Sequence, residues 1–207
     1  MANDLLSKIQ KQFEPNQLFA IADINDSKLD PATLKQRVVS LARDGKLVHF
    51  SYGFYYIPGK ITDPAPSSLD AIESRYLGSG KNIIGFYTGL NYLEHLKGIR
   101  PSLDEPMELM TNKATSGKKT IYIFQKRLTL RKPYYKIDSK NVNLNSFLSF
   151  IALAPLSLIK ENYSILSNYI KKNQLSANDV MDLAAYFPAK TASKLLSSDL
   201  YRSLWKH

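Results

Sequence analysis

The sequence predicts an α+β fold in two parts, and three observations lead to this class. The first 58 residues combine helical periodicities with one short β-rich segment. The stretch PGKITDPAPSS (58–68) holds three prolines and a glycine, and the remaining residues mix helix-like and strand-like segments. We therefore expect an N-terminal domain at 1–58, a linker at 59–68, and a larger mixed α+β domain at 69–207 with a small sheet and a helical C-terminal part.

Three helices are expected in the first domain. Apolar residues at helical spacing predict an amphipathic helix at 4–13, and a second short helix is expected at 17–24. The third helix has the clearest limits: Asp30 is a good N-cap, Pro31 suits the first helical position, and Gly45 supplies the left-handed residue that commonly ends a helix.

The outer face of this third helix follows from helical geometry. Leu34, Val38, Leu41 and Ala42 form one apolar stripe, which we expect to face the core. At about 100° per residue, the opposite side then carries a polar set with two basic residues on its flanks: Thr33, Gln36, Ser40 and Arg43, with Lys35 and Arg37 beside them.

A β-hairpin is expected directly after this helix, in the segment DGKLVHFSYGFYYIP (44–58). Aromatic and β-branched residues at 47–50 and 54–57 flank a turn at Ser51-Tyr52-Gly53. Side chains alternate along a strand, so Tyr55 and Tyr56 should point to opposite faces, one buried against the helices and the other exposed.

Three helices followed by a hairpin give the element order of a winged helix-turn-helix. In that arrangement the third helix enters the DNA major groove and the hairpin, called the wing, lies against the backbone. Winged helices also serve as protein-interaction modules, and a hairpin can simply seal a small helical core. The pattern therefore favours DNA binding and leaves these alternatives open.

The second domain is expected to contain helices and a small sheet. Helices are predicted at 67–77 and 86–96, and most of 144–205 is expected to be helical, with Ser176 and Asp179 resembling a capping box. Strands are expected at three places: 107–111, 120–126 and 134–137.

The charge is strongly positive and unevenly distributed. The chain has 28 Lys and Arg against 18 Asp and Glu, a net charge of +10. Residues 1–66 hold eight basic and seven acidic residues, whereas 113–140 hold nine basic residues and only Asp138 as acid. Such an excess favours a polyanionic partner, most often nucleic acid.

Aromatic residues are interleaved with this basic stretch. Its cations could bind DNA phosphates or an RNA, or they could form a solvated strand edge whose lysines discourage pairing with other molecules. The candidate phosphate-binding residues of this patch are Lys113, Lys118, Lys119, Lys126, Arg127, Arg131 and Lys132.

Several classes of chemistry find no support in the residues. Absence of cysteine excludes disulfides, thiolate zinc sites and cysteine nucleophiles, and the three histidines lack metal-ligand spacing. The segment LGSGKN (77–82) lacks the glycine and the hydroxyl residue of a phosphate-binding loop. We expect no enzymatic activity, no cofactor and no metal site.

No membrane association is expected either. The start of the chain lacks the pattern of a signal peptide, and the most apolar run, 147–159, is too short to span a bilayer and contains Pro155. These observations favour a cytoplasmic protein with no membrane partner.

The chain resembles the AbiEi-type antitoxins of bacterial type IV toxin-antitoxin (abortive infection) systems, which act in phage defence. The best-matching part is LDPATLKQRVVSLARDGKLVHFSYGFYYIP. It contains the family's basic residue, spacer and Gly-Lys-Leu (Arg43 to Leu47) and its Gly-aromatic-Tyr signature (Gly53 to Tyr56). The similarity continues through GFYTGLNYLEHLKGI, MELMT and ANDVMDLAAYFPAKTASKLL, and so covers nearly the whole chain.

This resemblance implies a transcriptional repressor of its own operon that binds inverted repeats in promoter DNA. It also implies that the protein opposes a nucleotidyltransferase-like toxin without a stable complex, and that the C-terminal domain is required for this effect. Carried onto this chain, the base-facing candidates are Thr33, Gln36, Ser40 and Arg43, and the backbone candidates are Lys35, Arg37, Lys46, Ser51 and Tyr52. Since residues 1–66 are almost neutral, the basic stretch of the second domain would have to add phosphate contacts.

Overall fold

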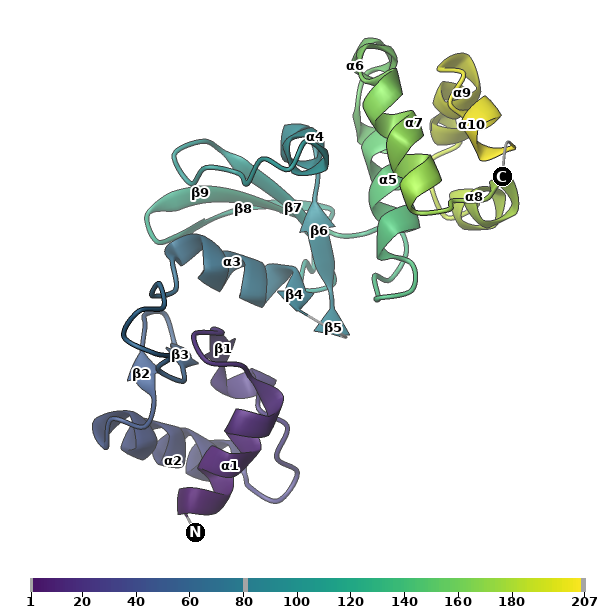
Figure 1. Ribbon diagram of the computed structural model, residues 1–207. Coiled ribbons are helices and arrows are strands. Elements are labelled where there is room, and N and C mark those ends of the chain that lie inside the picture. The colour runs from purple at the N-terminus through teal and green to yellow at the C-terminus, as the bar shows by residue number, and fades with distance from the viewer. Residues whose placement is uncertain (1, 80–81, 206–207) are drawn as a thin grey trace. The chain divides into compact units, whose positions relative to one another are not determined.

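A computed structural model describes residues 2–79 and 82–205 of the chain (Figure 1). It confirms the mixed α+β class, with ten helices and small sheets. The chain forms two compact units, residues 1–75 and 76–207, and each unit is described by itself below. The change of unit thus falls after the segment 59–68 that the sequence marks as a linker.

The first unit combines a three-stranded antiparallel sheet with helices. Strand β3 lies in the middle of this sheet, in the order β1-β3-β2. The elements of the unit are α1 (Ala2–Gln12), β1 (Phe19–Ala20), the 3-10 helix η1 (Ile21–Asp23), α2 (Pro31–Arg43), β2 (Val48–His49), β3 (Phe54–Tyr56) and α3 (Ser68–Tyr76).

The predicted helix at 17–24 is wrong. Phe19 and Ala20 form β1, whose backbone pairs with Tyr55 and Phe54 of β3, so only the 3-10 turn Ile21–Asp23 is helical there. The ring of Phe19 is fully buried and stacks on Phe13, with the ring centroids 4.4 Å apart. Pairing with a strand 35 residues later in the sequence overrides the local helical spacing.

Helix α2 has the bounds that its local signals predict. The Asp30 side chain accepts hydrogen bonds from the backbone amides of Ala32 and Thr33, and Gly45 adopts a φ of 70° just after the helix. Most of the predicted inner stripe is buried in the core of the unit, and Ala42 is partly buried against it. The core members are Leu5, Ile9, Phe19, Ile24, Leu34, Val38, Leu41, Leu47, Tyr55 and Ile57.

The predicted hairpin is confirmed as β2 and β3, joined by the expected turn at Ser51-Tyr52-Gly53. Phe54 donates its backbone amide to the carbonyl of Ser51, and Tyr52 and Gly53 have φ values of 50° and 78°. Positive φ at both central residues suits the twist of a tight hairpin. Tyr55 is the buried member of the tyrosine pair and Tyr56 is half-buried.

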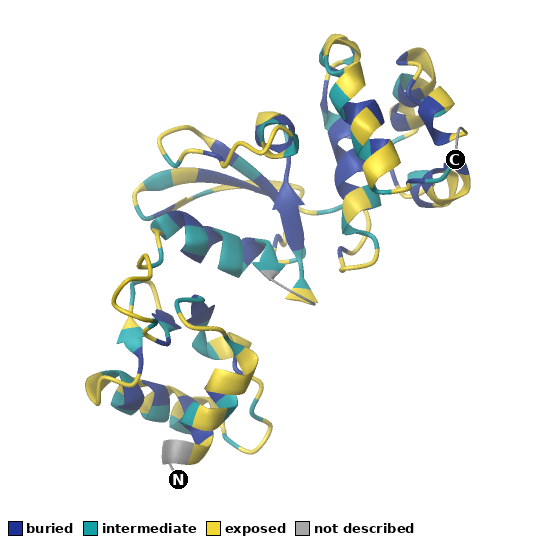
Figure 2. Cartoon of the chain, viewed as in Figure 1, coloured by how far each residue is buried: buried dark blue, intermediate teal, exposed yellow. Residues whose placement is uncertain are grey.

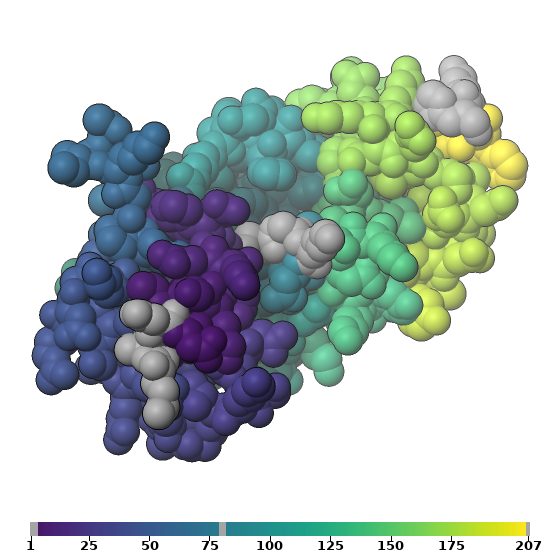
Figure 3. All heavy atoms as spheres, turned by 60° about the horizontal axis from the view of Figure 1, so that its bottom comes forward, coloured from purple at the N-terminus to yellow at the C-terminus, as the bar shows by residue number. Residues whose placement is uncertain are grey.

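The segment between β3 and α3 is mostly exposed, and Figure 3 shows it in blue as a protrusion from the first unit. Ile61 in this segment is fully exposed. Helix α3 is nevertheless joined to the unit, because the Ser74 hydroxyl donates to the Leu18 carbonyl at 2.5 Å. The Arg75 guanidinium also lies 5.7 Å from the centroid of the buried Phe54 ring.

A four-stranded mixed sheet forms the first part of the second unit. Its order is β6-β7-β9-β8, with β7 and β9 parallel and the other neighbours antiparallel. Strand β6 is buried along its whole length (Figure 2). The strands are β6 (Gly85–Tyr87), β7 (Met107–Thr111), β8 (Lys118–Ile123) and β9 (Lys126–Arg131), and a separate pair is formed by β4 (Gly78–Ser79) and β5 (Asn82–Ile83). Gly80 and Lys81 of the LGSGKN segment lie outside the described residues.

The strand predictions are right for β7 and partly wrong elsewhere. The predicted strand 120–126 is instead the hairpin β8–β9, because Phe124 and Gln125 form its turn with φ values of 52° and 60°. Residues 86 and 87 belong to β6 rather than to a helix. The predicted strand 134–137 does not form: the side-chain amide of Asn112 bonds both backbone groups of Ile137, at 2.7 and 3.0 Å.

The expected helical C-terminal part is confirmed. The apolar helix α5 is buried over most of its length and contacts α8 and α9 (Figure 2). Ser176 caps α8 by accepting the backbone amide of Asp179, as predicted. The helices are α4 (Leu90–Leu96), α5 (Val142–Leu153), α6 (Leu156–Glu161), α7 (Tyr163–Lys172), α8 (Ala177–Ala184), α9 (Lys190–Ser197) and α10 (Tyr201–Leu204). In the described ranges, every helix is too short or too polar to cross a bilayer.

The end of α5 is stabilised by a lysine from α9. The ammonium group of Lys194 donates to the carbonyls of Ile151 and Ala152, at 3.2 and 3.1 Å, and also to that of Ala154. These carbonyls have no further helical turn to bond, and a cation there complements the helix dipole. Burial lowers the pKa of Lys194, so the hydrogen bonds offset the cost of desolvating its charge.

Candidate nucleic-acid interface

The outer face of α2 carries the residues expected to face DNA bases. Lys35, Gln36 and Arg43 are exposed as predicted. The other three candidates on this helix are half-buried: Thr33, Arg37 and Ser40. The face is polar and cationic and has no carboxylate between Asp30 and Asp44.

Sequence reasoning missed Val39 on this face. It is 48% exposed and lies three residues after Gln36 and four before Arg43, so the three side chains share one side of the helix. The i, i+3, i+7 spacing of Gln36, Val39 and Arg43 could have indicated from the sequence that Val39 lies on the outer face. An exposed valine between two polar residues could contact a thymine methyl group in the major groove.

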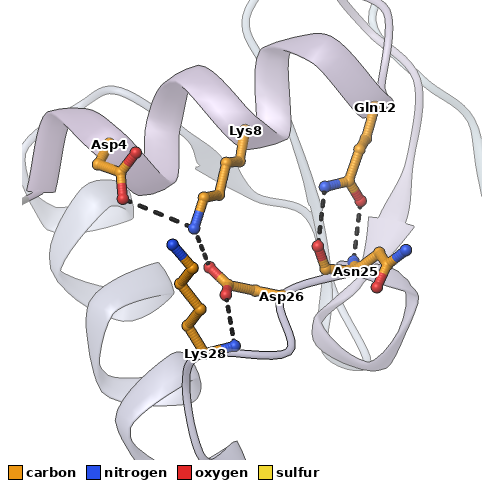
Figure 4. A network of polar contacts seen from close by, with 6 residues as sticks. All are labelled: Asp4, Lys8, Gln12, Asn25, Asp26 and Lys28. Atoms are coloured by element: carbon orange, nitrogen blue, oxygen red, sulfur yellow. Dashed lines mark hydrogen bonds and ion pairs between the residues drawn. The ribbon is translucent and has the colours of Figure 1, made fainter.

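The loop that leads into α2 is fixed to α1 by a polar network (Figure 4). Lys8 of α1 contacts Asp26 at 2.9 Å, and the Asp26 carboxylate also accepts the backbone amide of Lys28 at 3.0 Å. One turn further along α1, Gln12 accepts the backbone amide of Asn25 at 2.8 Å and donates to its carbonyl at 3.3 Å. These bonds join residues 25–28, just before α2, to α1.

The charges in this network stabilise one another. The hydrogen bond from Lys8 lowers the pKa of Asp26, whose side chain is only 2% exposed, and the same bond raises the pKa of Lys8. Asp4 adds a second carboxylate 3.6 Å from the Lys8 ammonium. At neutral pH Lys8 and Asp26 are therefore both held in their charged forms.

The hairpin after α2 presents the remaining candidates of the first unit. Lys46 is exposed, Ser51 is half-buried, and the ring of Tyr52 at the turn is 57% exposed. His49 on β2 is also exposed, and its ring lies 4.9 Å from that of the buried Tyr55. The turn thus presents an aromatic ring to solvent.

The basic candidates of the second unit differ in their surroundings. Lys126 forms an ion pair with Asp104 at 2.8 Å, and Arg131 forms one with Glu108 at 2.9 Å. The contact with Lys126 lowers the pKa of Asp104. The exposed candidates are Lys113, Lys118, Lys119, Arg127 and Lys132.

The hairpin β8–β9 gathers most of these cations. Residues 118–131 include five basic residues and no acidic one. Lys118 lies opposite Arg131, and Tyr122 lies opposite Arg127, so these four side chains point to the same side of the hairpin. The other side carries Leu128 and Leu130, which are buried.

The net charge differs sharply between the two units. Residues 1–75 hold nine basic and nine acidic residues, and 76–207 hold 19 basic and nine acidic residues. Long-range attraction of a polyanion therefore comes from the second unit, whereas the first unit offers only the local cations of α2 and its hairpin.

No group of three or more His, Asp or Glu side chains that could hold a metal ion occurs in the described ranges 2–79 and 82–205. Comparisons with protein-family models, with curated proteins and with solved structures give no match to this chain.

Proposed function

We propose that this chain is a DNA-binding autorepressor and the cytoplasmic antitoxin of a type IV toxin-antitoxin system, with a winged helix-turn-helix in its first unit. The observation that carries the DNA-binding part is the order α1-β1-η1-α2-β2-β3 together with the sheet order β1-β3-β2. This order supports α2 as the helix that enters the major groove and the β2–β3 hairpin as the wing.

In this proposal, α2 reads base edges and the second unit supplies affinity. Gln36 and Arg43 offer a bidentate amide and a guanidinium, the side chains that pair well with adenine and guanine. The wing contacts the backbone through Lys46 and Tyr52. Because the first unit is neutral overall, the exposed cations of the second unit add phosphate contacts.

The partners of this proposal follow from the resemblance to AbiEi-type antitoxins. The DNA partner is promoter DNA with inverted repeats. The functional partner is a nucleotidyltransferase-like toxin that is opposed without a stable complex. Co-expression with the toxin encoded beside this chain should restore growth, and failure to restore growth would contradict the antitoxin role.

The test of DNA binding is a titration of the full chain against its upstream duplex and a shuffled duplex. We expect Arg43→Ala to weaken binding of the upstream duplex by about 1 to 3 kcal/mol and to reduce the preference over shuffled DNA. Wild-type affinity in this variant would show that α2 does not read the DNA. Lys160→Ala, an exposed lysine in α6, is the control and should change neither value.

The contribution of the second unit is tested by salt dependence. Lys118→Gln, Lys119→Gln and Arg127→Gln together should flatten the slope of log affinity against log salt, by about 0.9 for each phosphate that is no longer neutralised. An unchanged slope would leave these residues as a solvated strand edge.

A further inference from the structure

The side of the β8–β9 hairpin that faces away from the core carries an aromatic ring. Tyr122 is 72% exposed, more than most large hydrophobic side chains of the described chain. It lies on β8, an edge strand of the sheet, directly opposite Arg127 on β9. A ring here contributes little to the core, because the buried apolar residues of the hairpin lie on its other side: Ile123, Leu128 and Leu130.

Exposed cations without acidic partners lie in and next to this hairpin. Lys118 and Arg127 are on the same side as Tyr122, whereas Lys119 is on the other side of β8 and Lys132 follows β9. None of these four forms an ion pair with a carboxylate among the described residues. Two acidic residues that contact this hairpin, Asp104 and Glu108, are already neutralised by Lys126 and Arg131. The surface is therefore electrostatically open to an anion.

The combination of ring and cations distinguishes two kinds of nucleic acid. Cations alone suffice to bind the phosphates of a duplex, whose bases are already stacked on one another. An exposed aromatic ring can instead stack on an unpaired base, while neighbouring Lys and Arg bind the flanking phosphates. From Lys118 to Tyr122 the strand extends about 14 Å at about 3.4 Å per residue, enough for a few nucleotides.

A hydroxyl group lies between the cation and the ring. Thr120 is exposed and lies two residues from both Lys118 and Tyr122. Side chains two residues apart on a strand point to the same side, so Thr120 shares the side of Lys118 and Tyr122. A hydroxyl can donate to and accept from the 2′-hydroxyl group, which distinguishes RNA from DNA.

We propose that the exposed side of the β8–β9 hairpin is a binding surface for single-stranded RNA, with Tyr122 stacking on one base. Arg127 and Lys118 bind phosphates on either side, and Thr120 contacts a ribose. This surface shares Lys118 and Arg127 with the cations proposed to contact promoter phosphates. Stacking of a base on Tyr122 does not depend on whether α2 reads DNA.

The test measures fluorescence anisotropy of a labelled, unstructured 12-nucleotide RNA with the full chain. Base stacking on an aromatic residue is worth about 1 to 3 kcal/mol, so Tyr122→Ala should weaken RNA binding by roughly 5- to 150-fold. Tyr122→Phe keeps the ring and should restore most of the affinity. Tyr186→Ala, which removes a ring 59% exposed elsewhere in the unit, should leave RNA binding unchanged.

Two further arms separate charge from stacking and RNA from other nucleic acids. Lys118→Gln with Lys119→Gln should weaken binding and flatten its salt dependence, whereas the matched pair Lys171→Gln with Lys172→Gln, also exposed, should do so much less. The single-stranded RNA should bind more tightly than a DNA strand or a duplex of the same sequence.

Several results would overturn this assignment: unchanged RNA affinity in a folded Tyr122→Ala variant, failure of Tyr122→Phe to restore binding, or equal affinity for the DNA strand or the duplex. The far-UV spectrum and melting temperature check that each variant is folded. Arg43→Ala keeps failure of the two proposals distinct, because it should weaken promoter binding and leave RNA binding intact.

Discussion

The two adjacent valines of α2 give a matched test of how this helix is placed. Val38 is fully buried in the core of the first unit, and Val39 is 48% exposed on the outer face. The two Val→Ala substitutions remove the same atoms from the same helix. Val38→Ala should nevertheless lower the stability of the unit, whereas Val39→Ala should weaken DNA binding.

For Val38→Ala the expected loss of stability is about 2 to 3 kcal/mol. The substitution removes the equivalent of two buried methylene groups, worth about 0.8 kcal/mol each, and leaves a cavity that adds to this cost. The higher helix propensity of alanine offsets about half a kcal/mol of this loss of stability. For Val39→Ala the smaller burial and the same gain in propensity roughly cancel, so stability should change by about 0.5 kcal/mol or less.

For DNA binding, Val39→Ala should have the larger effect and Val38→Ala little effect. Val39→Ala removes apolar surface that would lie in the major groove, and we expect about 1 kcal/mol, or roughly a fivefold weaker affinity for the upstream duplex. Folded Val38→Ala should bind with nearly wild-type affinity. Stability is measured by hydrogen exchange of the amides in residues 31–43, because a chain with two units need not unfold in one step. Affinity is measured by fluorescence anisotropy.

Two results would refute this reasoning. If Val38→Ala left amide protection in α2 unchanged, the helix would not be packed as described. If Val39→Ala bound the upstream duplex as tightly as the wild type, the outer face of α2 would not be in the groove.

Three further predictions concern stability. Asp26→Asn should remove a stabilising contribution that is present above the ordinary carboxyl pKa of 3.8 and is lost as the pH falls through the lower folded-state pKa. The melting temperature of the wild type should therefore fall more steeply below pH 4 than that of the variant. Lys194→Met keeps the apolar stem and removes the cation at the end of α5, which should cost about 1 to 2 kcal/mol in denaturant unfolding; no change would show that the carbonyls are satisfied otherwise. Gly85→Ala would place a Cβ 2.1 Å from the Tyr76 carbonyl oxygen and should lower the melting temperature strongly, whereas Gly117→Ala, with open space around it, should be neutral; equal effects would contradict the packing around β6.

Local signals predicted some elements well. Helix α2 has the expected bounds because Asp30 and Gly45 are signals that act within a few residues. The exposure of Gln36 and Arg43 likewise follows from the helical period alone. The strand β1 could not be found in this way, since it depends on pairing with a distant strand.

The hairpin β8–β9 shows a different limit of sequence reasoning. Its turn consists of Phe124 and Gln125, which adopt positive φ without the Gly or Asn that usually marks such a turn. The sequence therefore predicts one strand at 120–126, where the structure has the two strands β8 and β9. The ion pairs of Lys126 and Arg131 join different elements, so the sequence could not show which cations of the basic stretch remain available.

The strand order of the second unit has a consequence for how the chain folds during synthesis. Strand β9 lies between β7 and β8, although it follows both of them in the sequence. Hairpins form within microseconds, whereas the ribosome adds about 5 to 20 residues per second, so β8 and β9 can pair as soon as both have emerged. Until then one edge of β7 (Met107–Thr111) has no partner, and a nascent or truncated chain that ends before Arg131 exposes an apolar strand to aggregation.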